Sequence, residues 1–193
     1  HEAVLPIFIF DENILSQLEK DDARVTFIHK QLGNIQSELN KTGKSLAVFH
    51  GTPETVFKQL ISENTISAVF ANHDYEPAAR KRDTAINQLL KEHQIEFKTC
   101  KDQVIFEKSE VVKDDGTPYV VYTPYSKKWK EHLSKIRLVT YPSEDLLQNI
   151  AVHTYPFLSL SDIGFEKSNI EPKPFDISEK LITNYPETRN FPA

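Results

Sequence analysis

The stretch Leu46-Ala47-Val48-Phe49-His50-Gly51-Thr52-Pro53 decides the fold class of the chain. Its first four residues form a short apolar run, which is typical of a strand buried on both faces of a parallel sheet. Thr52 is a residue type that caps helices, and Pro53 suits the first helical position. The stretch therefore predicts a strand that leads almost directly into a helix.

The same alternation extends in both directions along the chain. Further strands are indicated at residues 4–10, 66–71, 95–99 and, more weakly, 104–106. Helical patterns lie between them at residues 22–41, from Pro53 onward, and from the end of the loop 72–77 to near His93. Strand, helix and strand at this spacing predict right-handed crossovers and a Rossmann-like α/β fold. We expect at least five largely parallel strands with helices on both faces.

The second half of the chain does not continue the regular alternation of strand and helix patterns. Residues 108–123 indicate a β-excursion around a turn at Asp114-Asp115-Gly116, and a basic helix follows at residues 125–133. Six of the eleven prolines lie from Pro142 onward, where little periodicity remains. We expect residues 142–193 to form a long irregular connector along the outside of the domain. Its apolar anchors should be Ile163, Phe165, Phe175 and Phe191, some of them left exposed.

Composition narrows the class of protein. The net charge is −5, so the chain lacks the basic surplus usual in a nucleic-acid-binding domain. Cys100 is the only cysteine and the seven histidines show no metal-ligand spacing, so we expect neither a metal site nor a catalytic triad. No apolar stretch is long enough to span a bilayer. We expect a cytoplasmic, monomeric protein with no membrane partner.

The segment Asn72–Asp83 is the most informative one for function. It places Asp74 and Glu76 in a loop at the end of a strand, just before a helix that carries Arg82. Ligands of parallel sheets bind beyond the carboxyl ends of the strands. Carboxylates, a helix start and an arginine there indicate a polar pocket for a ring ligand. The simpler alternative is that a carboxylate caps the helix and the arginines are solvated.

Several motifs, in order along nearly the whole chain, resemble the photolyase/cryptochrome family. The clearest is Asn-x-Asp-Tyr-Glu-Pro-x-x-Arg-x-Arg-Asp at residues 72–83. The others are Leu5-Pro6-Ile7-Phe8-Ile9-Phe10-Asp11, Gly51-Thr52-Pro53, Tyr119-Val120-Val121-Tyr122-Thr123-Pro124-Tyr125 with Trp129, and Thr188-Arg189-Asn190-Phe191-Pro192-Ala193. Jointly these motifs are highly specific.

The resemblance implies a domain organisation and an activity. Residues 1–141 would be the α/β antenna domain without the family's first strand, and residues 142–193 the interdomain linker. The FAD-binding domain would lie outside this chain. The parent protein would be a deoxyribodipyrimidine photo-lyase, a carbon–carbon lyase that uses light to repair UV-damaged DNA. Residues 1–193 alone would bind an antenna chromophore and would not be catalytic or bind damaged DNA.

The resemblance also implies a set of chromophore ligands. Family members that bind a reduced folate place Asn-Glu where this chain has Ala78 and Ala79, which cannot supply the same hydrogen bonds. Members that bind 8-hydroxy-5-deazaflavin use residues that match this chain. The implied pocket consists of Phe8, Phe10, Arg24, Asp74, Glu76 and Arg82. The favoured antenna chromophore is therefore 8-hydroxy-5-deazaflavin or FMN, with reduced folate less favoured.

Other functions stay open from the sequence. The chain could belong to a signalling cryptochrome, or it could be an unrelated nucleotide-binding α/β domain, although it lacks a glycine-rich phosphate loop. A third alternative is a domain without ligand that serves as an interdomain scaffold. The purified full-length protein should show flavin and antenna absorption bands together only if the chain is a light-harvesting domain. An unrelated nucleotide-binding domain and a scaffold without ligand both predict that these bands are missing.

Overall fold

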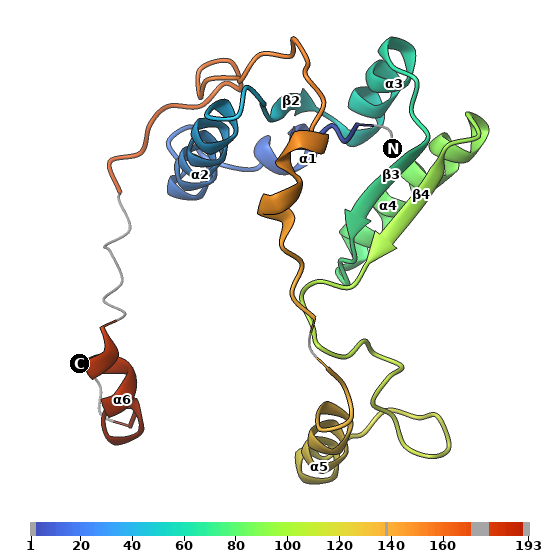
Figure 1. The fold of residues 1–193 in the computed structure, drawn as a ribbon, viewed down its shortest axis with the longest axis vertical. Coiled ribbons are helices and arrows are strands. Elements are labelled where there is room, and N and C mark those ends of the chain that lie inside the picture. The colour runs from blue at the N-terminus through green and yellow to red at the C-terminus, as the bar shows by residue number, and fades with distance from the viewer. Residues whose placement is uncertain (1–2, 138, 171–177, 191–193) are drawn as a thin grey trace.

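The computed structural model describes residues 3–137, 139–170 and 178–190. Its centre consists of two pairs of parallel strands, each strand five residues long (Figure 1). The first pair is β1 (Ile7–Asp11) with β2 (Ala47–Gly51), and the second is β3 (Ala68–Asn72) with β4 (Glu96–Cys100). In register, Ile7 lies opposite Ala47, and Ala68 lies opposite Glu96. The parallel α/β class predicted from the sequence is confirmed.

Helices connect the strands in the predicted alternation. After the short helix α1 (Glu12–Leu15), α2 (Ala23–Asn40) links β1 to β2, α3 (Pro53–Glu63) links β2 to β3, and α4 (Pro77–Glu92) links β3 to β4. The side chain of Thr52 accepts a hydrogen bond from the backbone N–H of Thr55, so this residue caps α3 as its type predicts.

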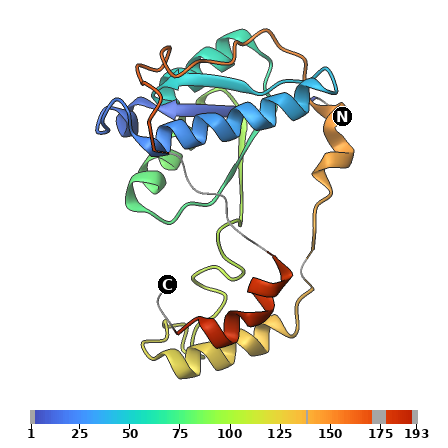
Figure 2. The ribbon, with the colours of Figure 1, turned by 90° about the vertical axis from the view of Figure 1, so that its left-hand side faces the viewer.

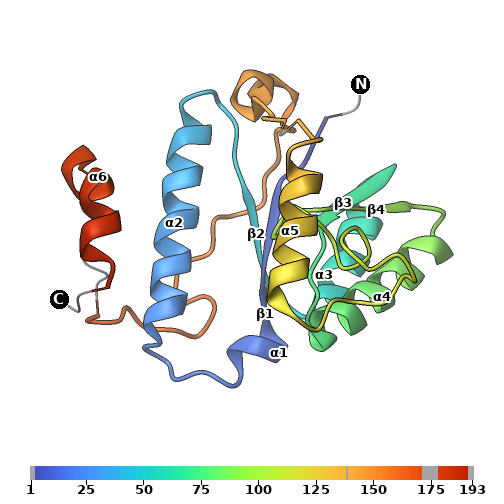
Figure 3. The ribbon, with the colours of Figure 1, turned by 90° about the horizontal axis from the view of Figure 1, so that it is seen from below.

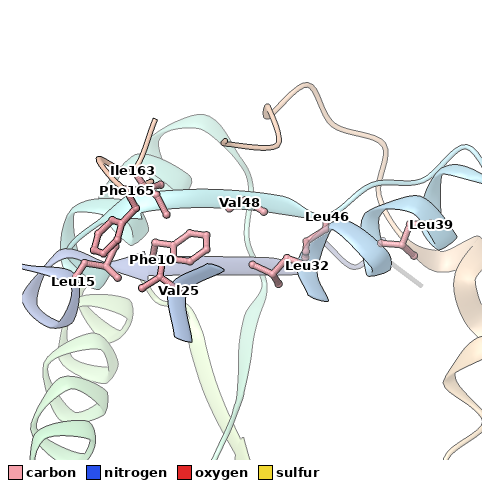
Figure 4. Packing of buried hydrophobic residues seen from close by; sticks show 9 residues of the cluster. All are labelled: Phe10, Leu15, Val25, Leu32, Leu39, Leu46, Val48, Ile163 and Phe165. Carbon is pink, nitrogen blue, oxygen red and sulfur yellow. The ribbon is translucent and has the colours of Figure 1, made fainter. Parts of the chain in front are cut away.

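Buried side chains lie on both faces of the β1–β2 pair. Beneath α2 they form one cluster of nine residues: Phe10, Leu15, Val25, Leu32, Leu39, Leu46, Val48, Ile163 and Phe165 (Figure 4). On the other face, Ala47 and Phe49 of β2 pack with side chains of α3 and α4. Val69 of β3 and Phe97 of β4 pack against this second cluster. The α3–α4 layer therefore covers both strand pairs, whereas α2 covers only the first.

The β3–β4 pair is less covered. Phe70, in the middle of β3, leaves 67% of its surface exposed, and the Lys98 ammonium of β4 lies 5.6 Å from the centre of its ring. Neither strand contains a fully buried residue. One face of this pair is thus open to solvent within the described part of the chain.

The predicted number of strands is wrong for the part of the chain that the structure describes. That part contains four strands in two separate pairs, and not one sheet of at least five. Residues 104–106 form no strand, and Val104 and Ile105 stay exposed. Residues 108–123 also contain no strand: their turn is closed by hydrogen bonds between Lys113 and residues 116–117. Whether a first strand is missing from the chain stays a prediction.

The segment after β4 is only partly attached to the body. Helix α5 (Tyr122–Leu133), the 3₁₀ helix η1 (Ser143–Asn149) and α6 (Glu179–Thr188) contain no buried residue. Figures 1 and 2 show α5 and α6 apart from the strand pairs. The sequence did not lead us to expect α6. No helix among the described residues is both long enough and apolar enough to cross a membrane.

Residues 150–170 form a strap without regular helix or strand, and it crosses the α2 side of the body (Figure 3). Ile163 and Phe165 are buried in the cluster beneath α2, which confirms them as anchors. The backbone N–H of Glu166 donates to the carbonyl of Lys20 over 2.8 Å, which fixes the strap beside α2. The other two predicted anchors, Phe175 and Phe191, lie outside the described residues.

Candidate ligand-binding site

A cavity of about 350 Å³ lies at the carboxyl ends of β3 and β4. This size is at the lower end of the range usual for small-molecule sites. Nine residues from both strand ends, from α4 and from the loop after β4 line it: His73, Asp74, Tyr75, Arg80, Asp83, Thr84, Thr99, Glu107 and Lys108. Its place agrees with the expectation that ligands bind beyond the strand ends of a parallel sheet.

Strand pairing brings these residues together. Because β3 and β4 run parallel, the residues that follow β3 lie beside the end of β4. The backbone N–H of His73 donates to the carbonyl of Cys100 over 2.7 Å, which extends the ladder by one residue. The loop after β4 is held in turn by Glu110, whose carboxylate accepts from the Lys101 ammonium at 2.6 Å and from the backbone N–H of Glu107.

Glu107 is the centre of a hydrogen-bonded network in the cavity. Its Oε1 atom accepts from Nδ1 of His73 and from the hydroxyl of Tyr75, the latter over 3.0 Å. When His73 is neutral and donates from Nδ1, its Nε2 is the acceptor for the Thr99 hydroxyl 2.7 Å away. The network therefore ties the β3 end, the β4 end and the following loop into one wall.

The network shifts the acidity of two of its members. The hydrogen bond from His73 lowers the pKa of Glu107, and the hydrogen bond from Tyr75 lowers it further. Loss of solvation raises the pKa of Tyr75, as does its hydrogen bond to the Glu107 carboxylate. At neutral pH the wall thus contains an ionised carboxylate and a neutral phenol, and both prefer the state that maintains their contact.

Two cations on the cavity wall are not engaged by protein groups. Within the described ranges, neither the Arg80 guanidinium nor the Lys108 ammonium forms a hydrogen bond or an ion pair. The carboxylates of the same wall are engaged: Asp83 by Arg82, Glu107 by His73 and Tyr75, and Asp74 by a backbone N–H. The cavity lining therefore combines three carboxylates with two cations that are free to contact a ligand.

Of the six predicted chromophore ligands, the structure brings one to this cavity. Asp74 lines it, and its Oδ1 atom accepts from the backbone N–H of Glu76 over 3.0 Å. Glu76 is the residue before α4 and makes no side-chain capping bond. Arg82 points its guanidinium to its neighbour Asp83, with 2.8 Å between Nη2 and Oδ1.

The other three predicted ligands lie on β1 and at the start of α2. The rings of Phe8 and Phe10 contact each other edge to face at 5.0 Å, and Phe10 is buried in the cluster beneath α2. Arg24, with 72% of its side chain exposed, pairs with Asp22 at 2.6 Å. This contact lowers the pKa of Asp22 to about 2. The role of the six residues as chromophore ligands stays a prediction.

Sequence reasoning missed the residues that complete the cavity. His73, Tyr75 and Arg80 lie within the quoted motif, but the implied set of chromophore ligands did not include them. Glu107 directly follows the predicted fifth strand, and Lys108 begins the predicted β-excursion. The order of the predicted strands could have identified Glu107 and Lys108. Because β3 and β4 are parallel neighbours, the residues after β4 begin beside the end of β3.

Comparison with known proteins gives the chain a family. A sequence profile described as DNA photolyase matches residues 1–144. The deoxyribodipyrimidine photo-lyase of Alkalihalophilus pseudofirmus is 39% identical over 80% of this chain and 35% of its own length. That of a Synechococcus sp. is 27% identical over 98% of this chain and 43% of its own length. The chain thus spans less than half of these two curated relatives. Cryptochrome-1 of Rattus norvegicus is 24% identical over 76% of this chain and 26% of its own length.

Solved structures give the same result. The archaeal photolyase of Sulfolobus tokodaii superposes with a TM-score of 0.55 and 28% identity, over 72% of this chain and 30% of the other. That protein contains two FAD molecules, which its authors connect with a novel light-harvesting cofactor. A class III photolyase from Agrobacterium tumefaciens gives a TM-score of 0.55 and 29% identity over 64% of this chain and 25% of its own. The profile match over most of the chain, together with these structures, shows that the chain belongs to the DNA photolyase family.

Proposed function

We propose that this chain is the light-harvesting, chromophore-binding part of a deoxyribodipyrimidine photo-lyase. The observation that carries the proposal is the cavity at the carboxyl ends of β3 and β4, in a chain of this family. Its polar network and its uncommitted cations are suited to a ring ligand with hydrogen-bonding edges. The second FAD of the archaeal relative supports a flavin-like ring as the chromophore.

The residues of the cavity fit such a group chemically. Tyr75 offers an aromatic ring, Thr99 a hydroxyl, and Asp74 a carboxylate that can accept from a ring N–H. The His73–Glu107 pair fixes the wall in one arrangement, so these groups need little reordering when a ligand binds. When bound, the chromophore would supply light absorption and pass the excitation energy on to FAD.

We further propose 8-hydroxy-5-deazaflavin or FMN over a reduced folate, because Ala78 and Ala79 stand where folate-type relatives are expected to hold the pterin. The domain division at residues 141 and 142, FAD binding outside this chain and action on UV-damaged DNA by the parent protein belong to the same proposal. Identities of 27% and 39% to photolyases, against 24% to a cryptochrome, favour repair over signalling.

The test is a spectroscopic titration of the full-length protein with FMN, with 8-hydroxy-5-deazaflavin and with a reduced folate. We expect a tricyclic chromophore to bind, with a shifted visible band, and Asp74→Ala to weaken that binding. Folate binding that is tight and indifferent to Asp74→Ala would overturn the choice of chromophore. Failure of all three to bind would overturn the antenna function itself.

A further inference from the structure

Helix α5 and the residues that follow it carry a local excess of positive charge. Residues 122–137 contain five cations and a single carboxylate, whereas the whole chain has a net charge of −5. The cations are Lys127, Lys128, Lys130, Lys135 and Arg137. A basic surplus that is concentrated on one helix is the electrostatic feature of a surface that contacts a polyanion.

The two sides of α5 differ in character. The rings of Trp129 and His132 contact Phe106 edge to face, with 5.5 and 5.9 Å between ring centres. Because an α-helix turns about 100° per residue, Lys127 and Lys130 lie on the side turned away from these rings. Both lysines are exposed, and α5 lies apart from the strand pairs (Figure 1). The charged side of α5 is therefore accessible to a partner.

Only two of the five cations are close to carboxylates of the protein. Lys135 pairs with Glu131, the one carboxylate of the segment, at 2.6 Å, and the Lys128 ammonium lies 3.9 Å from Asp114. The other three cations are exposed, and within the described part of the chain their side chains form neither an ion pair nor a hydrogen bond. These three are Lys127, Lys130 and Arg137.

We propose that the basic face of α5, defined by Lys127, Lys130 and Arg137, binds the sugar–phosphate backbone of duplex DNA. The proposal rests on the photo-lyase function proposed above and adds a contact surface to it. Charge complementarity carries it, since duplex DNA has one negative charge per about 1.7 Å of its axis. From Lys127 to Arg137 the segment spans about 15 Å at the helical rise, a length over which one DNA strand presents about four phosphates.

The arrangement favours a contact that does not depend on sequence or damage. Lysines bind phosphates as point charges, and such contacts position a protein on DNA without reading its bases. A helix that binds a membrane surface inserts its apolar side, whereas Trp129 of α5 packs against Phe106. Recognition of a lesion therefore stays outside α5, in accord with the expectation that residues 1–193 alone do not bind damaged DNA.

The salt dependence of DNA binding by the full-length protein measures this contribution. Each phosphate contact adds about 0.9 to the slope of log K against log salt concentration. We expect the triple variant Lys127→Gln, Lys130→Gln, Arg137→Gln to lower that slope by about 2–3. At low salt its binding should weaken at least about tenfold, equally for an undamaged duplex and for the same duplex with a UV lesion. Fluorescence anisotropy titrations at several salt concentrations give both quantities.

A second triple variant matches the change in net charge. Lys58→Gln, Lys81→Gln and Lys91→Gln remove three exposed cations from α3 and α4, and should leave the affinity and the slope nearly unchanged. Melting temperatures verify that both variants are folded. Their chromophore absorption should equal that of the unchanged protein, because none of the six replaced residues lines the cavity. Vesicles that contain an anionic lipid are the second probe, and we expect the unchanged protein not to bind them.

The outcomes separate this inference from the proposed function. An unchanged slope in the α5 variant overturns the DNA contact, as does an equal loss in the control variant, which shows an effect of net charge alone. A loss confined to the damaged duplex shows lesion recognition and also overturns it. Vesicle binding that disappears in the α5 variant, with DNA binding unchanged, assigns the face to a membrane surface instead. If the unchanged full-length protein binds neither duplex, the photo-lyase function fails together with this inference.

Discussion

The two strand pairs have the same length and direction but different surroundings. The β1–β2 pair is covered by α2 and the strap on one face and by the α3–α4 layer on the other. The β3–β4 pair is covered on one face only, and its strand ends form the cavity. The comparison shows a division within the domain: the first pair is buried on both faces, and the second pair presents the polar site at its strand ends. The pair with fewer buried side chains is the one that can accommodate a ligand.

Two phenylalanines give the sharpest test of this difference. Phe10 and Phe70 both lie inside a strand, but 3% of one and 67% of the other is exposed. We expect Phe10→Ala to lower the free energy of unfolding by about 3–5 kcal/mol, because it leaves a cavity beneath α2. Phe70→Ala should change it by about 0.5 kcal/mol or less. Urea denaturation measures both, and similar losses would contradict this division.

The strap should matter for the β1–β2 pair and not for the other. Phe165→Ala should cost about 2 kcal/mol, less than Phe10→Ala, because the strap can detach while the strands stay paired. Hydrogen exchange of the Glu166 amide, which donates to the Lys20 carbonyl, should then accelerate. Val152→Ala is the control, since that strap residue is 78% exposed. Unchanged protection of Glu166 in the Phe165 variant would show that Phe165 does not anchor the strap.

Ligand affinity decides which pair holds the chromophore. Asp74→Ala, at the β3–β4 pair, should weaken flavin binding more than tenfold, the equivalent of about 1.5–3 kcal/mol for a charge-assisted hydrogen bond. Arg24→Ala, on the helix α2 that covers the β1–β2 pair, should leave the affinity unchanged if the cavity is the whole site, since Arg24 forms an ion pair with Asp22. Fluorescence titration measures both. A loss in Arg24→Ala instead would restore the six-residue pocket that the family resemblance implies.

The smallest expected effect is a pH dependence confined to the β3–β4 pair. The pKa of Glu107 is lowered in the folded state, chiefly by His73, so its contribution to stability is complete above the ordinary value of 4.5. That contribution disappears as pH falls through the lower folded value. We expect the melting temperature to drop less between pH 5 and pH 3 in Glu107→Gln than in the unchanged protein. Identical profiles would show that the carboxylate contributes nothing to the wall.

The sequence predicted the body well because local patterns there agree with burial. The apolar stripe of residues 22–41 became α2, and the helix expected after the loop 72–77 became α4, which already begins at Pro77. Periodicity could not show that α5 buries no side chain, because that depends on which surface lies beside it. High proline density hid α6, which contains Pro186 near its end. The contact of His73 with Glu107 depends on strand pairing, and no single stretch of sequence encodes it.

The separation of the strands into two pairs makes every strand in the described part an edge strand. One side of each therefore presents main-chain N–H and C=O groups that no neighbouring strand satisfies. Such edges can form hydrogen bonds with any extended segment that offers the complementary main-chain groups. A single additional strand that paired with a free edge of each ladder would join the two ladders into one continuous sheet. The middle of this domain is therefore where a further strand, from the same polypeptide or from another one, would form the most main-chain hydrogen bonds.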